Sequence, residues 1–196
     1  MSSPPLRDRG RKKRPDNAVP VQPMNNTKYL RFFKHTAYVL LLLVLYVLQT
    51  VPGLFVIYGT KPILVVPAAI VIAMLEGEFV GGVYGAVAGL LCDMGGFSLF
   101  GFNGFVITVC CVAAGLLIIY LLRCNLWNCL LLVLVTLLLR GSVEYVFSYG
   151  MWGYEGVWKI YVYRVLAVVA YSVAVTPAIY FLTAKLHNGF YAAERE

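Results

Sequence analysis

The stretch that decides the fold of this chain is GEFVGGVYGAVAGLLCD, residues 77–93. Glycine recurs at every fourth position, and the next step of four reaches a carboxylate: Gly77, Gly81, Gly85, Gly89 and Asp93. In a soluble helix each glycine costs about 1 kcal/mol against alanine, whereas in a membrane small residues let two helix backbones pack closely. A period of four keeps these positions near one helix face. The row predicts a helix-packing face, either internal or used for a partner, that ends at an acid.

The composition places the chain among integral membrane proteins. Hydrophobic residues make up 61% of the sequence and charged residues 13%, and the mean hydropathy is +0.79. The apolar runs are continuous and do not alternate, which argues against a β-barrel. We expect an all-α protein with about six transmembrane helices in one bundle. The membrane domain covers residues 29–188, between a tail at 1–28 and a short C-terminal tail at 189–196.

The N-terminal tail is polar and basic, and we expect it to be disordered because it cannot bury enough apolar surface to fold. Nine of the sixteen basic residues lie before the first apolar run, so the positive-inside rule places both termini in the cytoplasm. The run at 9–14 predicts contact with anionic lipid; a nuclear-localisation signal is the weaker alternative. The residues of this lipid-contacting run are Arg9, Arg11, Lys12, Lys13 and Arg14.

Apolar runs predict the individual spans. Two of them are only 13–14 residues long and are joined by Glu76-Gly77-Glu78. Residues 62–92 therefore form either two helices with Glu76 and Glu78 at the cytoplasmic interface, which we favour, or a re-entrant hairpin. The six predicted spans are Thr36–Tyr58, Ile63–Leu75, Phe79–Cys92, Phe105–Leu122, Leu126–Phe147 and Ile160–Thr183.

Four charged residues fall in the outer half of this topology. Asp93 ends the third span, Arg140 and Glu144 lie one turn apart on the fifth, and Arg164 lies near the outer end of the sixth. Intramembrane charges usually face one another inside a bundle. We expect these four to form one intramembrane charge cluster; the alternative is that Glu144 and Arg164 reach out to the interface.

Catalytic motifs are missing from the sequence. The two histidines, His35 and His187, fall at cytoplasmic ends and have no serine partner in reach, and no residues have metal-ligand spacing. The five cysteines lie in or beside apolar runs and resemble small membrane hydrophobes. We expect no enzymatic activity, no cofactor, no metal and no nucleic-acid partner.

The segment Lys61–Gly101 resembles the rod shape-determining protein MreD family of bacteria. The matching elements are Lys61-Pro62 before the second span, the spacing Gly85-x₃-Gly89-x₃-Asp93-x₇-Gly101, and the small-residue loop at 95–98. Size, span count and a basic N-terminus agree with the family over roughly residues 30–188. The 28-residue tail is longer than the family pattern, and the last three spans match only in hydropathy. The charged residues of those spans therefore inherit no role.

The resemblance implies a non-enzymatic component of the cell-wall elongation machinery in the bacterial cytoplasmic membrane, multi-pass, with MreC, RodA, a class B penicillin-binding protein and MreB as partners. The same fold is related to the substrate-binding subunits of energy-coupling-factor vitamin transporters, which gives the alternative function. A membrane enzyme such as a lipid transferase is a third class, and it lacks a catalytic constellation here.

The topology can be tested by labelling. A cysteine introduced at Ser2 should resist a membrane-impermeant maleimide in whole cells, and one at Gly156 should react, because the basic residues hold the N-terminus inside. Labelling at Ser2 in intact cells would reverse the orientation and the outer placement of Asp93.

Overall fold

The computed structural model describes residues 26–51, 61–94, 101–146 and 157–193. These residues form an all-helical protein without strands, which confirms the all-α class. The helices are α1 (Asn26–Thr50), α2 (Val65–Glu76), α3 (Glu78–Met94), α4 (Phe102–Tyr120), α5 (Leu126–Tyr145) and α6 (Val157–Ala193).

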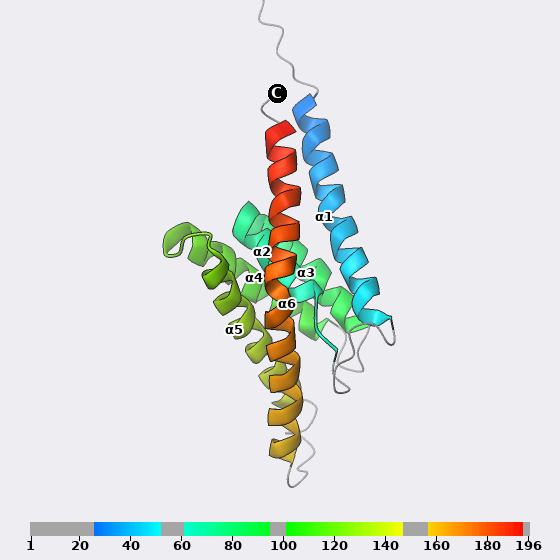
Figure 1. The fold of residues 1–196 in the computed structure, drawn as a ribbon, viewed down its shortest axis with the longest axis vertical. Helices are drawn as coiled ribbons and strands as arrows, with labels where there is room; N and C mark the ends of the chain where they lie inside the picture. Colours follow the sequence, from blue (N-terminus) through cyan, green and yellow to red (C-terminus); the bar gives the residue numbers. More distant parts are fainter. Residues whose placement is uncertain (1–25, 52–60, 95–100, 147–156, 194–196) are drawn as a thin grey trace, which may run out of the picture.

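Four of these helices, α1, α4, α5 and α6, contain stretches long and apolar enough to cross a membrane. A membrane protein is therefore supported, while six spans, a multi-pass topology and the bacterial cytoplasmic membrane stay predictions. α1 begins at the same end of the molecule at which α6 ends (Figure 1). Which side of a membrane this end faces also stays a prediction.

The helix bounds differ from the sequence-based spans most in α1 and α6: α1 ends at Thr50, whereas the predicted first span continues to Tyr58, and residues 52–58 lie outside the described residues. α1 starts ten residues before the predicted first span, so residues 26–28 of the expected disordered tail are helical. α6 has 37 residues, about 55 Å of helix, and runs on into the predicted C-terminal tail as far as Ala193. The basic run at 9–14 lies outside the described residues, and so do residues 147–156 between the fifth and sixth helices.

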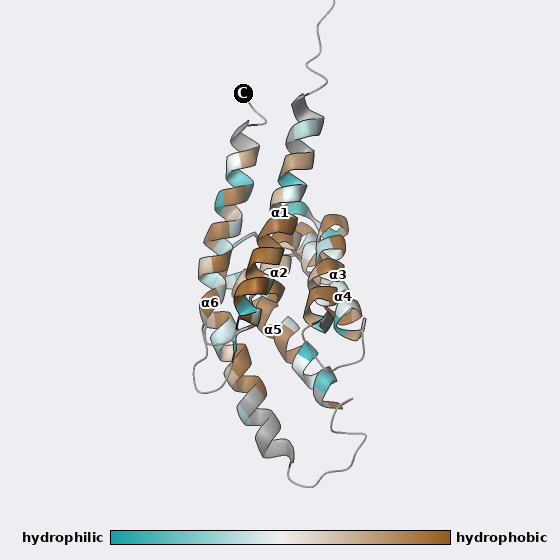
Figure 2. Ribbon diagram, turned by 90° about the vertical axis from the view of Figure 1, so that its right-hand side faces the viewer, coloured by the Kyte–Doolittle hydropathy of each residue, from teal (hydrophilic) through white to brown (hydrophobic). Residues whose placement is uncertain are grey.

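α2 lies at the centre of the bundle, between α1, α6 and the α3–α4 pair (Figure 2). Every residue from Val65 to Met74 is buried. The helix is apolar around its whole circumference, and a helix of that kind must be surrounded by other elements or by lipid. It has 12 residues, about 18 Å, and so falls short of a hydrocarbon core of about 30 Å. Pro67 fits in its first turn, where no intrahelical N–H bond is lost.

The chain reverses between α2 and α3 at Gly77, whose φ of 91° lies in the left-handed region that favours glycine. Gly115 of α4 packs directly against the backbone of this turn, because a Cβ at Gly115 would lie 2.6 Å from the Cα of Glu78. Two helices and a re-entrant hairpin both contain such a turn. The choice between them for residues 62–92 stays open.

The glycine row of α3 is covered by α2 and α4 of the same chain. A Cβ at Gly81 would lie 2.4 Å from the Cβ of Ala73 on α2, and one at Gly85 would lie 2.8 Å from the Cβ of Cys111 on α4. A Cβ at Gly89 would lie 2.4 Å from the Cα of Gly104. These three positions therefore serve internal packing, and a partner helix must use another surface.

We expect Gly89→Ala to destabilise the folded protein by at least 1–3 kcal/mol, because the new methyl meets backbone that cannot move aside. The matched control is Gly189→Ala on α6, where a Cβ has nothing within 4 Å. Thermal unfolding in detergent measures both. Equal stability of Gly89→Ala and the wild-type chain would contradict the close α3–α4 contact.

Candidate functional site

Asp93, near the end of α3, closes the first turn of α4. The residue is only 3% exposed. Its Oδ2 accepts hydrogen bonds from the backbone N–H of Gly101 at 2.8 Å and of Gly104 at 3.2 Å. The first N–H groups of a helix have no partner within that helix, and leaving them unpaired in an apolar interior is costly. Asp93 thus caps α4 from a neighbouring helix.

The spacing Gly85-x₃-Gly89-x₃-Asp93-x₇-Gly101 is explained by this junction. Gly85 and Gly89 let α4 approach α3 closely, and Asp93, one turn further, then reaches the start of α4. Gly101 precedes α4 with a φ of 90°, a conformation that other residues rarely adopt. The motif is one structural unit, in which the glycines allow close packing and Asp93 caps α4.

The predicted charge cluster is divided between two arrangements. Arg140 on α5 donates from Nε to Oδ1 of Asn103 at 2.9 Å, and its Nη2 lies 3.9 Å from Oε2 of Glu144. Asp93 instead bonds the backbone of α4, so its connection to Arg140 runs through the adjacent residues Asn103 and Gly104. The side chain of Arg164 lies outside the described residues.

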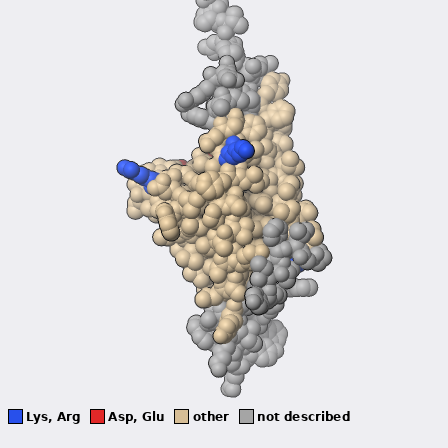
Figure 3. Space-filling model, viewed as in Figure 1, with Lys and Arg blue, Asp and Glu red and all other residues tan. Residues whose placement is uncertain are grey.

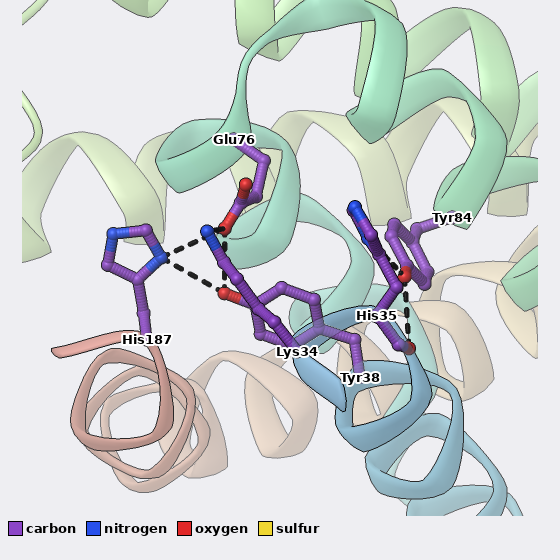
Figure 4. A network of polar contacts seen from close by, with 6 residues as sticks. All are labelled: Lys34, His35, Tyr38, Glu76, Tyr84 and His187. Carbon is purple, nitrogen blue, oxygen red and sulfur yellow. Dashed lines mark hydrogen bonds and ion pairs between the residues drawn. The ribbon is translucent and has the colours of Figure 1, made fainter. Parts of the chain in front are cut away.

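A second polar cluster occupies the end of the bundle where α1 begins and α6 ends (Figure 4). Oε1 of Glu76, the last residue of α2, receives three groups. Nζ of Lys34 lies 2.5 Å away, the hydroxyl of Tyr38 donates at 2.9 Å, and Nδ1 of His187 lies at 2.9 Å. Nδ1 of His187 is also 3.0 Å from the Tyr38 hydroxyl. We call Lys34, Tyr38, Glu76 and His187 the Glu76 cluster.

The neighbours of Glu76 keep its carboxyl group ionised. Burial raises the pKa of the Glu76 carboxyl, but the hydrogen bonds from Lys34 and Tyr38 and the charge of Lys34 outweigh it, so the pKa lies below its ordinary value. Glu76 is therefore an ionised acceptor shared by α1, α2 and α6. With three donors on one oxygen it holds helices together and is poorly placed to act as a base.

A pair of aromatic residues borders the Glu76 cluster on the α3 side. The hydroxyl of Tyr84 donates to the carbonyl of His35 at 3.1 Å and lies 3.0 Å from Nδ1 of His35. The rings of Tyr38 and Tyr84 meet edge to face, with centroids 5.7 Å apart. Both histidines of the chain thus lie at this end, each beside a tyrosine hydroxyl.

The sequence indicates cytoplasmic ends for Glu76, His35 and His187 one by one, and it does not predict that Glu76 and His187 meet. The contact partners lie 38 residues apart for Tyr38 and Glu76, and 111 apart for Glu76 and His187. The one feature of the sequence that could have indicated this contact is that Glu76 and His187 are both predicted at the same end of the bundle.

The described residues contain no group of three or more potential metal ligands. The five cysteines are free thiols. No protein family, curated protein or solved structure matches this chain. The MreD resemblance consequently stays an expectation from the sequence.

Substitutions at Asp93 test its capping role. Asp93→Asn keeps an oxygen that can accept the N–H groups of Gly101 and Gly104, so we expect a small loss of stability. Asp93→Ala removes the cap, and we expect it to cost about 0.5–2 kcal/mol or more. Thermal unfolding of both variants and of Glu144→Ala, whose side chain is 47% exposed, supplies the comparison. A larger loss for Glu144→Ala than for Asp93→Ala would contradict the assignment.

Proposed function

We propose that this chain is a non-enzymatic membrane component of the bacterial cell-wall elongation complex, as the MreD resemblance implies. In this role it organises lateral peptidoglycan synthesis through helix–helix contacts with MreC, RodA and a class B penicillin-binding protein, with MreB in the same complex. It resides in the cytoplasmic membrane as a multi-pass protein with both termini inside.

The observation that carries the proposal is that three polar side chains inside the bundle, Gln49, Asp93 and Ser172, accept backbone N–H groups at or just before helix starts. Oε1 of Gln49 accepts the N–H groups of Leu64 and Val65 at the start of α2. Asp93 does the same at the start of α4, and Oγ of Ser172 accepts the N–H of Ile63. Polar groups committed to helix ends stabilise a fold and are not free to perform chemistry. This arrangement supports a scaffold.

Partner helices need a surface that the bundle itself leaves open. The glycine row is covered by α2 and α4, so we assign partner contacts to the outward faces of α1, α4 and α5. These faces expose large apolar side chains, among them Leu40, Val44, Phe105, Val109, Leu131 and Val135. A single-span partner can pack there in competition with lipid.

The charge distribution supports the proposed orientation. The described surface in Figure 3 is almost free of charge, and its basic side chains lie in the half where α1 begins and α6 ends. In the sequence, the basic run at 9–14 comes shortly before the start of α1. Together these features favour a cytoplasmic side that contacts anionic lipid.

One observation favours the alternative, a substrate-binding subunit of a vitamin transporter. Oδ1 of Asp93 is buried and has no hydrogen-bond partner. A buried acceptor of this kind is costly unless it is paired, and a donor on a bound ligand could pair it. The neighbouring polar groups Asn103 and Arg140 bond one another, which makes the site poorer in free donors than a vitamin pocket requires.

The proposed function predicts that depletion in a rod-shaped host gives rounded, swelling cells and that the chain co-purifies with MreC in mild detergent. A photo-crosslinking amino acid at Val44, Val109 or Val135 samples the outward faces of α1, α4 and α5, all partly exposed. We expect at least one position to crosslink to MreC or RodA.

Unchanged rods after depletion would contradict the elongation role. Purification with a bound vitamin and a pair of coupling ATPases would establish the alternative instead.

A further inference from the structure

The turn between α4 and α5 exposes aromatic and apolar side chains beside a cation. Tyr120, Leu121 and Trp127 are 76%, 77% and 80% exposed, and Arg123, which lies between them in the sequence, is exposed as well. Apolar side chains that are exposed together mark a partner or a membrane, and Trp and Tyr are the residues enriched where a membrane meets water. We call Tyr120, Leu121, Arg123 and Trp127 the turn patch.

The two helices that meet at this turn match the thickness of a bilayer. α4 has 19 residues and α5 has 20, which correspond to about 28 Å and 30 Å of helix. The hydrocarbon core of a bilayer is about 30 Å thick. Both helices contain a stretch apolar enough to cross it. When α4 and α5 cross such a core, the turn between them comes to lie at one of its surfaces, where the turn patch meets the lipid headgroups.

The turn patch belongs to the end of the bundle that carries the Glu76 cluster. Ile119, in the last turn of α4, packs at the turn between α2 and α3, where a Cβ at Gly77 would lie 3.8 Å from its Cδ1. Cys124 interacts through its thiol with the hydroxyl of Tyr180 on α6. The patch therefore shares a side with the start of α1, which the basic run at 9–14 precedes in the sequence.

The guanidinium group of Arg123 is available to an anion. Lys34 and Arg140 are ion-paired within the chain, whereas the ion pairs among the described residues do not include Arg123. Its carbonyl accepts a hydrogen bond from Nδ2 of Asn128 at 2.8 Å, which helps to fix the backbone of the turn. A guanidinium is always charged and can bond a phosphate through two parallel N–H groups. At the surface of a bilayer, that phosphate is part of a lipid headgroup.

We propose that the turn patch binds an anionic phospholipid, with the lipid phosphate on Arg123 and the upper part of the acyl chains beside Tyr120, Leu121 and Trp127. An acidic protein is the other occupant that the charge allows. The exposed apolar side chains around Arg123 favour a partner that joins an apolar part to its anion, and a lipid has both. The proposal rests on the membrane location that the apolar helices support. It does not rest on the elongation role, which its failure would leave as it stands.

The test measures how deep Trp127 lies and which lipid surrounds it. Trp152→Phe and Trp158→Phe leave Trp127 as the single tryptophan of the full chain, which is reconstituted in vesicles of phosphatidylcholine and anionic phosphatidylglycerol. Either lipid, spin-labelled near the headgroup or near the methyl end of its acyl chain, quenches the fluorescence. We expect the headgroup-side label to quench Trp127 more strongly. We also expect labelled phosphatidylglycerol to quench it roughly twofold to fivefold more than labelled phosphatidylcholine.

Variants separate the site from a general attraction between the chain and anionic lipid. Arg123→Gln should abolish the preference for phosphatidylglycerol and leave the depth of Trp127 unchanged. Lys61→Gln removes another exposed cation, outside the patch, and should preserve the preference. High salt should weaken the preference without any change at Arg123, because exposed charges are screened. For the depth scale, Val109→Trp combined with Trp127→Phe puts a tryptophan at an exposed position near the middle of α4, where the methyl-end label should quench more.

Four results would overturn the lipid site. Stronger quenching of Trp127 by the methyl-end label would remove the turn patch from the membrane surface. Equal quenching by the two lipids would leave Arg123 without an anionic lipid. A preference that persists in Arg123→Gln or at high salt would have another source, such as the basic run at 9–14. Loss of the preference in Lys61→Gln would show an effect of overall charge.

Discussion

The structure depends on one constraint: α2 and α4 begin against neighbouring helices, and the first N–H groups of each helix must find acceptors there. Each unpaired group in such surroundings costs several kcal/mol. Side chains of other helices accept these N–H groups. Gln49 of α1 does so for α2, and Asp93 of α3 does so for α4. Ser172 of α6 adds a bond to Ile63, just before α2. The start of each of these two helices is thereby fixed by its neighbours.

The same constraint explains why the glycine row and Asp93 occur together. Asp93 can cap α4 only if the start of α4 lies against the end of α3, and Gly89 with Gly104 makes that approach possible. α2 fills the space beside this pair with an entirely apolar surface, and Ala73 packs where Gly81 leaves room. Close packing and capping thus support each other, which is the consistency across levels that a well-specified fold requires.

The sequence predicted the all-α class, because continuous apolar runs have few alternatives, and it identified the glycine row through its period of four. Asp93 was recognised as important but assigned to a charge cluster, because its partners are the backbone N–H groups of Gly101 and Gly104, which leave no side-chain signal. The Glu76 cluster was missed for another reason. Its members lie on three helices, and at a helix end a lone Glu, Lys or His is ordinary.

The two polar regions of the bundle differ in how readily they can rearrange. At the α3–α4 junction a carboxylate bonds backbone N–H groups that have no alternative partner, so opening it would unpair a helix end in an apolar interior. At the Glu76 cluster, side chains bond side chains, and Lys34 and His187 each retain partial exposure, 16% and 18%. These bonds can therefore open without unpairing a helix end. Any conformational response of this protein should therefore begin where α1 starts and α6 ends, with the α2–α3–α4 core as its fixed support.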